Sequence, residues 1–127
     1  MIQIGIQSEI LHQIISGQKT IEGRLNKGKF SLLNVGDEVS IREDIYVNGE
    51  VVSSIDNRLK IKIETIQNYN SFKQMLNDVG YQNAIPAAKN LNDAVDAYRA
   101  FYSVEDEDEY GVVALSFSIV PTASIID

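Results

Sequence analysis

Cysteine and tryptophan are absent from this chain of 127 residues, which also has a single histidine and only two prolines. Without cysteine the protein forms no disulfide, thiol nucleophile or thiolate metal site, and it is compatible with a reducing compartment. A lone histidine cannot hold zinc tightly, so we expect no metal and no other cofactor. The longest uninterrupted apolar run, VVAL at 112–115, is far shorter than the roughly twenty residues that span a bilayer.

The amino-terminal stretch MIQIGIQSEIL lacks both the basic start and the continuous apolar core of an export signal. We therefore expect a soluble, cytoplasmic protein without membrane contact. Hydrophobic residues at 44 % and charged residues at 23 % are ordinary values for a globular chain. Because one hydrophobic core serves a chain of about this length, we expect a single domain over residues 1–127.

Basic residues are scarce, with 11 Lys and Arg against 18 Asp and Glu, and the net charge is -7. This balance argues against a general nucleic-acid coat protein, because phosphate neutralisation drives non-specific binding. The basic residues are nevertheless concentrated. Segment 19–29 holds four cations and one anion, namely Lys19, Arg24, Lys27, Lys29 and Glu22. Any polyanion would have to meet this segment rather than the acidic run EDEDE at 105–109.

Apolar residues at helical spacing predict helices near residues 8–16, 71–79 and 91–102. Ser8, Ser71 and Asn90 stand at the expected cap positions of these three helices. Alternating patterns predict strands near residues 19–25, 38–42, 58–66 and 112–119, and Asn48-Gly49 is typical of a hairpin turn. Since strands and helices do not alternate regularly, we expect a small mixed barrel or sheet of the α+β class.

One short strand is a candidate site. If residues 19–25 form a strand, Glu22 and Arg24 share one face of it and lie about 7 Å apart, which long side chains can bridge. Gly23 between them leaves room for a ligand or another backbone to approach closely. The alternative interpretation is a surface ion pair, which contributes only about 0–1 kcal/mol.

The segment GQKTIEGRLNKGKFSLLNVGDEVSI carries the pattern G-x-K-T-x-E-x-R followed by GDEV, and it resembles the signature of the ASCH domain, a relative of the PUA fold. YNSFKQMLNDVGYQNAIP and AYRAFYSVEDEDEYGVVALSF resemble the second half of the same family, so the resemblance covers nearly the whole chain. It implies a PUA-like small mixed β-barrel with flanking helices, and a cleft in which the lysine, glutamate and arginine of the motif converge. The motif positions in this sequence are Gly17, Lys19, Thr20, Glu22 and Arg24.

Many ASCH proteins are regarded as probable RNA or nucleotide binders, so the resemblance implies RNA or a small nucleobase-containing ligand as the partner. We assign Lys19 and Arg24 to a phosphate or a carbonyl group of that ligand, beside Thr20. Glu22 would meet an exocyclic amine or orient Arg24. Lys27 and Lys29 would extend a phosphate track.

Two tyrosines flank the acidic run at 105–109. Tyr102 and Tyr110 would wall the cleft and stack on a base, as aromatic side chains commonly do with unpaired nucleotides. The alternative is that both pack in the core, as large aromatic residues mostly do. We expect the acidic run itself to be a solvated turn before the last strand.

One branch of the family consists of small acetylcytidine amidohydrolases, which are thought to use the motif lysine, a threonine two positions before the motif arginine, and a glutamate from the helical segment. Here Lys19 is present, but the threonine position holds Glu22, and helix 70–80 offers only Asp78 as a carboxylate. We do not expect that activity. Two alternatives remain: a hydrolysis of a modified nucleoside or RNA with Glu22 as general base and Lys19 stabilising negative charge, and a protein-interaction module that uses the acidic face.

Overall fold

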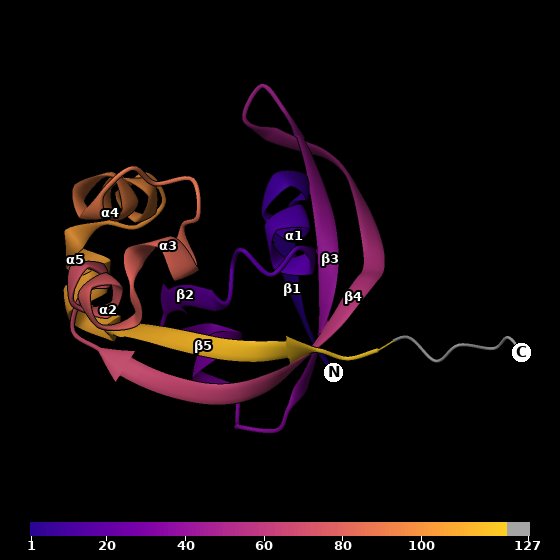
Figure 1. Ribbon diagram of the computed structural model, residues 1–127, viewed down its shortest axis with the longest axis horizontal. Coiled ribbons are helices and arrows are strands. Elements are labelled where there is room, and N and C mark those ends of the chain that lie inside the picture. Colours follow the sequence, from indigo (N-terminus) through magenta and orange to yellow (C-terminus); the bar gives the residue numbers. More distant parts are fainter. Residues whose placement is uncertain (122–127) are drawn as a thin grey trace, which may run out of the picture.

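The computed structural model, which describes residues 1–121, contains one five-stranded sheet in the order β1-β3-β4-β5-β2. The strands are β1 (Ile2–Gln7), β2 (Ile21–Leu25), β3 (Glu38–Val47), β4 (Glu50–Tyr69) and β5 (Val112–Ile119). Only β1 and β3 run parallel, and the other neighbouring strands are antiparallel. The long β4 bends so that the sheet curls into a half-barrel (Figure 1). The α+β prediction of a small barrel with flanking helices is confirmed.

Within residues 1–121, five α-helices and one 3-10 helix flank the curled sheet. They are α1 (Ser8–Ile15), the 3-10 helix η1 (Gly28–Leu32), α2 (Phe72–Val79), α3 (Tyr81–Ala84), α4 (Leu91–Arg99) and α5 (Val104–Tyr110). The predicted caps at Ser71 and Asn90 are confirmed, because their side chains accept hydrogen bonds from the backbone N–H groups of Gln74 and Asp93. The predicted cap at Ser8 is wrong, since Ser8 is already helical and Gln7 holds the cap position.

Two hydrophobic cores lie on opposite faces of β5. Val113 and Leu115 belong to the first core, which lies between the curled sheet and α1, whereas Val112 and Ala114 belong to the second, between β2, β5 and helices α2 to α4. A strand that is buried on both faces is apolar at every position rather than at alternate ones. The alternation in GVVALSFSI therefore indicated only one of the two buried faces.

The hairpin at Asn48-Gly49 is confirmed, and it joins β3 to β4. Asn48 and Gly49 have φ values of 52° and 82°, as a two-residue turn between twisted strands requires. Val47 pairs with Glu50 directly across this turn. β4 continues to Tyr69 and is therefore much longer than the predicted strand at 58–66. Strand β1 was not predicted at all.

The acidic run at 105–109 lies in helix α5, so the prediction of a solvated turn is wrong. The side chain of Ser103 caps this helix by accepting a hydrogen bond from the N–H of Asp106. Glu107 is only 4 % exposed, and its carboxylate lies 2.6 Å from Nη2 of Arg99. This ion pair joins α5 to α4 and compensates one of the negative charges. Among the described residues, no helix is long and apolar enough to cross a membrane.

Candidate functional site: a charged cleft between helices

A cleft of about 370 Å³ is lined by residues of β2, α1, α3 and α4. Figure 1 shows α1 on one side of β2 and α3 and α4 on the other. Lys19, Glu22 and Arg24 line the cleft, and we call these three residues the charged floor. β2 positions Glu22 and Arg24 on one face because alternate residues of a strand point the same way. Lys19 precedes the strand and is almost fully buried, with 4 % of its surface exposed.

Glu22 is at the centre of the charged floor. Its Oε2 atom accepts a hydrogen bond of 2.6 Å from Nε of Arg24, and its Oε1 atom lies 3.4 Å from Nζ of Lys19. Nζ of Lys19 also donates to the carbonyl oxygen of Ala84, at the end of α3, over 2.5 Å. Both oxygens of the carboxylate therefore have a cationic partner, and Lys19 ties the start of β2 to a helix distant in the sequence.

Burial and neighbouring charges set the protonation of the charged floor. Burial alone would raise the pKa of Glu22, but the charges of Lys19 and Arg24 together hold that pKa below its ordinary value. Burial lowers the pKa of Lys19, and the charge of Glu22 opposes this shift without cancelling it. Glu22 is accordingly ionised throughout the neutral range and acts as a fixed negative charge between two cations.

Gly23 faces away from the charged floor, toward the second core. A Cβ atom at this position would lie 2.8 Å from Cε of Met75 and 2.8 Å from the hydroxyl oxygen of Tyr98. The space on this side of Gly23 is thus filled by side chains of α2 and α4, whereas Gly23 itself is among the residues that line the cleft. The Tyr98 hydroxyl is itself buried and makes no hydrogen bond of ordinary geometry.

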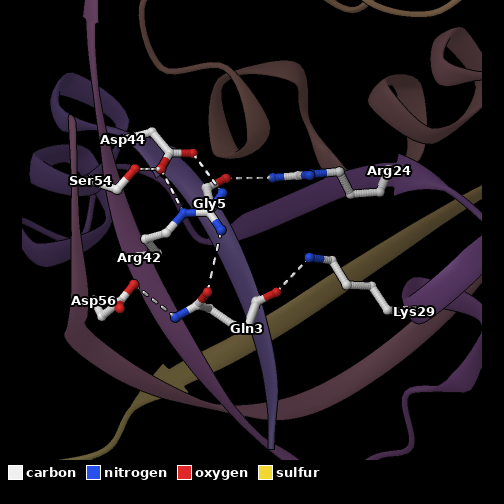
Figure 2. Close-up of polar contacts among 8 residues, drawn as sticks. All are labelled: Gln3, Gly5, Arg24, Lys29, Arg42, Asp44, Ser54 and Asp56. Atoms are coloured by element: carbon white, nitrogen blue, oxygen red, sulfur yellow. Dashed lines mark hydrogen bonds and ion pairs between the residues drawn. The ribbon is translucent and has the colours of Figure 1, made fainter. Parts of the chain in front are cut away.

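Side chains of β2 and of η1 connect this part of the half-barrel to its other edge strand, β1. Arg24 donates from Nη2 to the carbonyl oxygen of Gly5 over 3.3 Å, and Lys29 donates to that of Gln3 over 2.6 Å (Figure 2). We call this connection the seam. Arg42 and Asp44 pair across the backbone at Gly5, where a Cβ atom would collide with both side chains. A larger residue at this position of the seam would force the ends of the Arg42 and Asp44 side chains to move.

The structure brings together only some of the residues that the sequence singles out. Lys19, Glu22, Arg24 and Tyr102 line the cleft. The remaining four, Thr20, Lys27, Lys29 and Tyr110, are not among the lining residues. Thr20 is exposed, and its backbone N–H donates to Asn83. Lys27 lies over the ring of Tyr110, with its Nζ atom 4.8 Å from the ring centroid.

Three aromatic residues that line the cleft were not assigned to the site from the sequence, namely the buried Tyr98 and two exposed ones. Phe101 is 71 % exposed and Tyr46 is 42 % exposed, and both line the cleft. Phe101 lies within the predicted helix 91–102, but α4 ends at Arg99, before Phe101. Tyr46 stands next to the hairpin turn at Asn48-Gly49, and this was the only signal that it lies on a projecting arm.

The described residues contain no cluster of three or more His, Asp or Glu side chains suited to hold a metal ion. The single histidine, His12, is exposed on α1. Three of the four charged residues that line the cleft, Lys19, Glu22 and Arg24, pair with one another, and the fourth, Glu9, is exposed on α1.

Comparisons with known proteins agree with this architecture. The chain is similar to the hypothetical protein PH0355, whose crystal structure superposes with a TM-score of 0.79 at 35 % identity, over 93 % of this chain and 97 % of that one. It is also similar to protein PF0455 from Pyrococcus furiosus, whose solution structure gives a TM-score of 0.74 at 33 % identity, over 95 % and 98 % of the two chains. The comparison with curated proteins gave no match.

A family comparison matches the ASCH domain over residues 4–121. The match includes the segment that carries Lys19, Glu22 and Arg24, as well as the helices that complete the cleft. The curled half-barrel with flanking helices is consistent with the PUA-like fold. This chain therefore belongs to the ASCH domain family.

Proposed function

We propose that the cleft binds a nucleobase-containing ligand and that RNA supplies it. The observation that supports this most is the combination of a charged floor with aromatic walls in a cleft of about 370 Å³. Such a volume lies at the small end of the range for ligand sites, which is about 300–1,000 Å³. Aromatic walls suit the face of a base, and fixed polar groups suit its edge. The association of the ASCH family with RNA points the same way.

Arg24 is the group of the charged floor that we assign to direct ligand contact. Its side chain is 22 % exposed, compared with 5 % for Lys19 and 10 % for Glu22. The contacts with Glu22 and Gly5 use two of the five N–H donors of an arginine, and the others remain for a carbonyl oxygen of the ligand. Glu22 orients Arg24, and Lys19 holds Glu22 in place.

The geometry favours binding over hydrolysis. Thr20 does not line the cleft, so it is badly placed as a nucleophile. Glu22 is held ionised by two cations, which makes its carboxylate a weak base. We therefore expect the purified protein to release no cytidine from acetylcytidine. A steady release that Lys19→Ala abolishes would instead support the amidohydrolase alternative.

A thermal-shift and calorimetric screen of nucleosides, nucleotides and short single-stranded RNAs tests the proposal. A ligand at a hundredfold excess over its dissociation constant should stabilise the wild type by about 2.7 kcal/mol. Arg24→Ala should lose this stabilisation. Arg58→Ala is the matched control, because Arg58 also pairs with a buried glutamate, Glu43, but lies outside the cleft.

Two results would contradict the proposal. One is that no compound of the panel shifts the transition of the wild type. The other is that Arg24→Ala and Arg58→Ala respond to the ligand equally, since the cleft would then not be the site.

A further inference from the structure

The charges around the cleft cancel. Within the described residues 1–121, the charged residues that line it are Glu9, Lys19, Glu22 and Arg24, two of each sign. Both cations are already engaged, with the carboxylate of Glu22 and with the carbonyl oxygens of Ala84 and Gly5. Glu9 is the exposed member of the set, on α1. A phosphate that entered would find no uncompensated cation.

The aromatic residues of the cleft differ in how much of their rings is free. The Tyr102 ring stacks on Phe72, with centroids 5.2 Å apart, and Phe72 also stacks on Tyr98 at 4.3 Å. One face of Tyr102 is therefore already covered. Phe101, which is 71 % exposed, and Tyr46, which is 42 % exposed, have far more free surface.

These two free aromatic residues come from different parts of the fold. Phe101 follows the end of α4, and Tyr46 lies near the tip of the β3–β4 hairpin, which projects beside α1 (Figure 1). Both line the same cleft. A planar ring that enters between α1 and α4 therefore meets an aromatic side chain from the helical wall and another from the hairpin arm.

We infer that the cleft accepts a single uncharged nucleobase, which stacks on Phe101 and Tyr46 and points its edge at Arg24, while any phosphate stays outside. This inference rests on the proposed function and narrows its ligand class. The ligand is either a free nucleoside or one unpaired residue of an RNA. Burying an ionised phosphate without a free partner charge is strongly unfavourable, whereas burying a neutral base costs much less when its polar edge regains hydrogen bonds, here from Arg24. Base stacking on aromatic side chains tolerates different bases.

The first experiment compares a nucleoside with its 5′-monophosphate by calorimetry at about 50 mM and about 200 mM salt. We expect the phosphate to add no affinity, and the affinity of the nucleoside to be the same at both salt concentrations. If the monophosphate binds at least about tenfold more tightly at low salt and loses this advantage at high salt, the inference is wrong while the proposed function stands. If neither compound nor any RNA binds, both are wrong.

The second experiment removes the aromatic side chains. Phe101→Ala should weaken nucleoside binding by about 5- to 150-fold, the range for one base–aromatic stack. Tyr46→Ala should also weaken nucleoside binding. Phe101→Tyr should bind the nucleoside about as well as the wild type does, because it keeps the aromatic ring. Leu32→Ala is the matched control, because Leu32 is 70 % exposed but lies outside the cleft. Wild-type affinity in Phe101→Ala would overturn the inference even if Arg24→Ala abolishes binding.

A third set of ligands distinguishes the two possible sources of the base, a free nucleoside and an unpaired residue of an RNA. A short RNA with unpaired ends should compete with the nucleoside, and Phe101→Ala should weaken both. A blunt duplex of the same sequence should not compete, because its bases are paired and stacked. Competition by the duplex equal to that of the single strand would overturn the inference, since a paired base cannot enter the cleft.

Discussion

At the scale of single residues, Glu22 is the group that neutralises the buried positive charge of the cleft. It is 8 % exposed and balances the two cations of the charged floor, Lys19 and Arg24. Removing one partner of a buried ion pair leaves uncompensated charge in a poorly solvated place. The orientation of Arg24 and the stability of this region thus depend on the same carboxylate.

We predict that Glu22→Gln lowers the free energy of unfolding at neutral pH by about 3 kcal/mol. The effect should shrink in acid. The folded pKa of Glu22 lies below its ordinary value of 4.5, so its stabilisation is complete above that pH and disappears as the pH falls through the folded pKa. Denaturant titrations from neutral pH to below pH 4.5 should therefore show a steeper acid loss in the wild type than in the variant.

The control for this titration is Glu38→Gln. Glu38 pairs with Lys60 at 3.5 Å, but both side chains are nearly half exposed. Its removal should change the free energy of unfolding by less than about 0.5 kcal/mol at any pH. Parallel pH profiles for the wild type and Glu22→Gln would show that Glu22 has no shifted pKa.

A second prediction at the scale of single residues concerns Gly23. A Cβ atom there would press against Met75 and the Tyr98 hydroxyl, so Gly23→Ala should lower the free energy of unfolding by about 1–3 kcal/mol. Tyr98→Phe removes that hydroxyl, which has no partner, and should by itself be nearly neutral. The double variant should therefore lose less than the sum of the two single losses. Additive losses in urea unfolding would mean that the two sites do not share this space.

Helix α5 shows how short-range and long-range contacts combine at the scale of elements. Its sequence, VEDEDEY, contains five consecutive acidic residues, Glu105 to Glu109, whose like charges repel one another. The Ser103 cap places these acidic residues near the helix N-terminus, where negative charge is favourable. Glu107 is then drawn into the ion pair with Arg99 of α4.

Loss of the Ser103 cap should destabilise the protein. We predict that Ser103→Ala lowers the free energy of unfolding by about 1 kcal/mol, because the N–H of Asp106 loses its hydrogen-bond acceptor. Ser103→Asp should keep most of the wild-type free energy of unfolding, because aspartate caps a helix about as well as serine does. Ser53→Ala, at an exposed position of β4, is the control and should cost less than about 0.5 kcal/mol. Equal unfolding midpoints for the two alanine variants would rule out this role of the cap.

The seam is the feature that matters at the scale of the whole molecule. It brings Arg24 and Lys29 to carbonyl oxygens two residues apart on β1, which are about 7 Å from each other along the strand (Figure 2). The exposed Lys29 therefore lies next to Arg24 of the charged floor along β1, and the exposed Lys27 precedes Lys29 in the sequence. If an RNA residue enters the cleft, we expect its phosphates to follow this direction.

Salt dependence tests this phosphate track. If Lys27 and Lys29 contact phosphates of single-stranded RNA, log affinity should fall with log salt with a slope of about -1.4, from roughly -0.7 per contact. Lys27→Ala and Lys29→Ala should each flatten the slope by about 0.7 with little change in stability. Lys73→Ala, on the exposed side of α2, should leave the slope unchanged. A slope that neither variant alters would mean that the phosphates lie elsewhere.

The sequence by itself determined most of the local structure, because spacing and turn chemistry depend on near neighbours. Alternation predicted that Glu22 and Arg24 share a face of one strand, and Asn48-Gly49 predicted the hairpin. Only the tertiary structure decided what surrounds that face. The hydrogen bond from Lys19 to Ala84 joins residues 65 positions apart, and no local period records such a contact. The exposure of Phe101, beyond the end of α4 at Arg99, likewise was not predicted by the apolar spacing over residues 91–102, because that spacing does not indicate which tertiary contacts each residue makes.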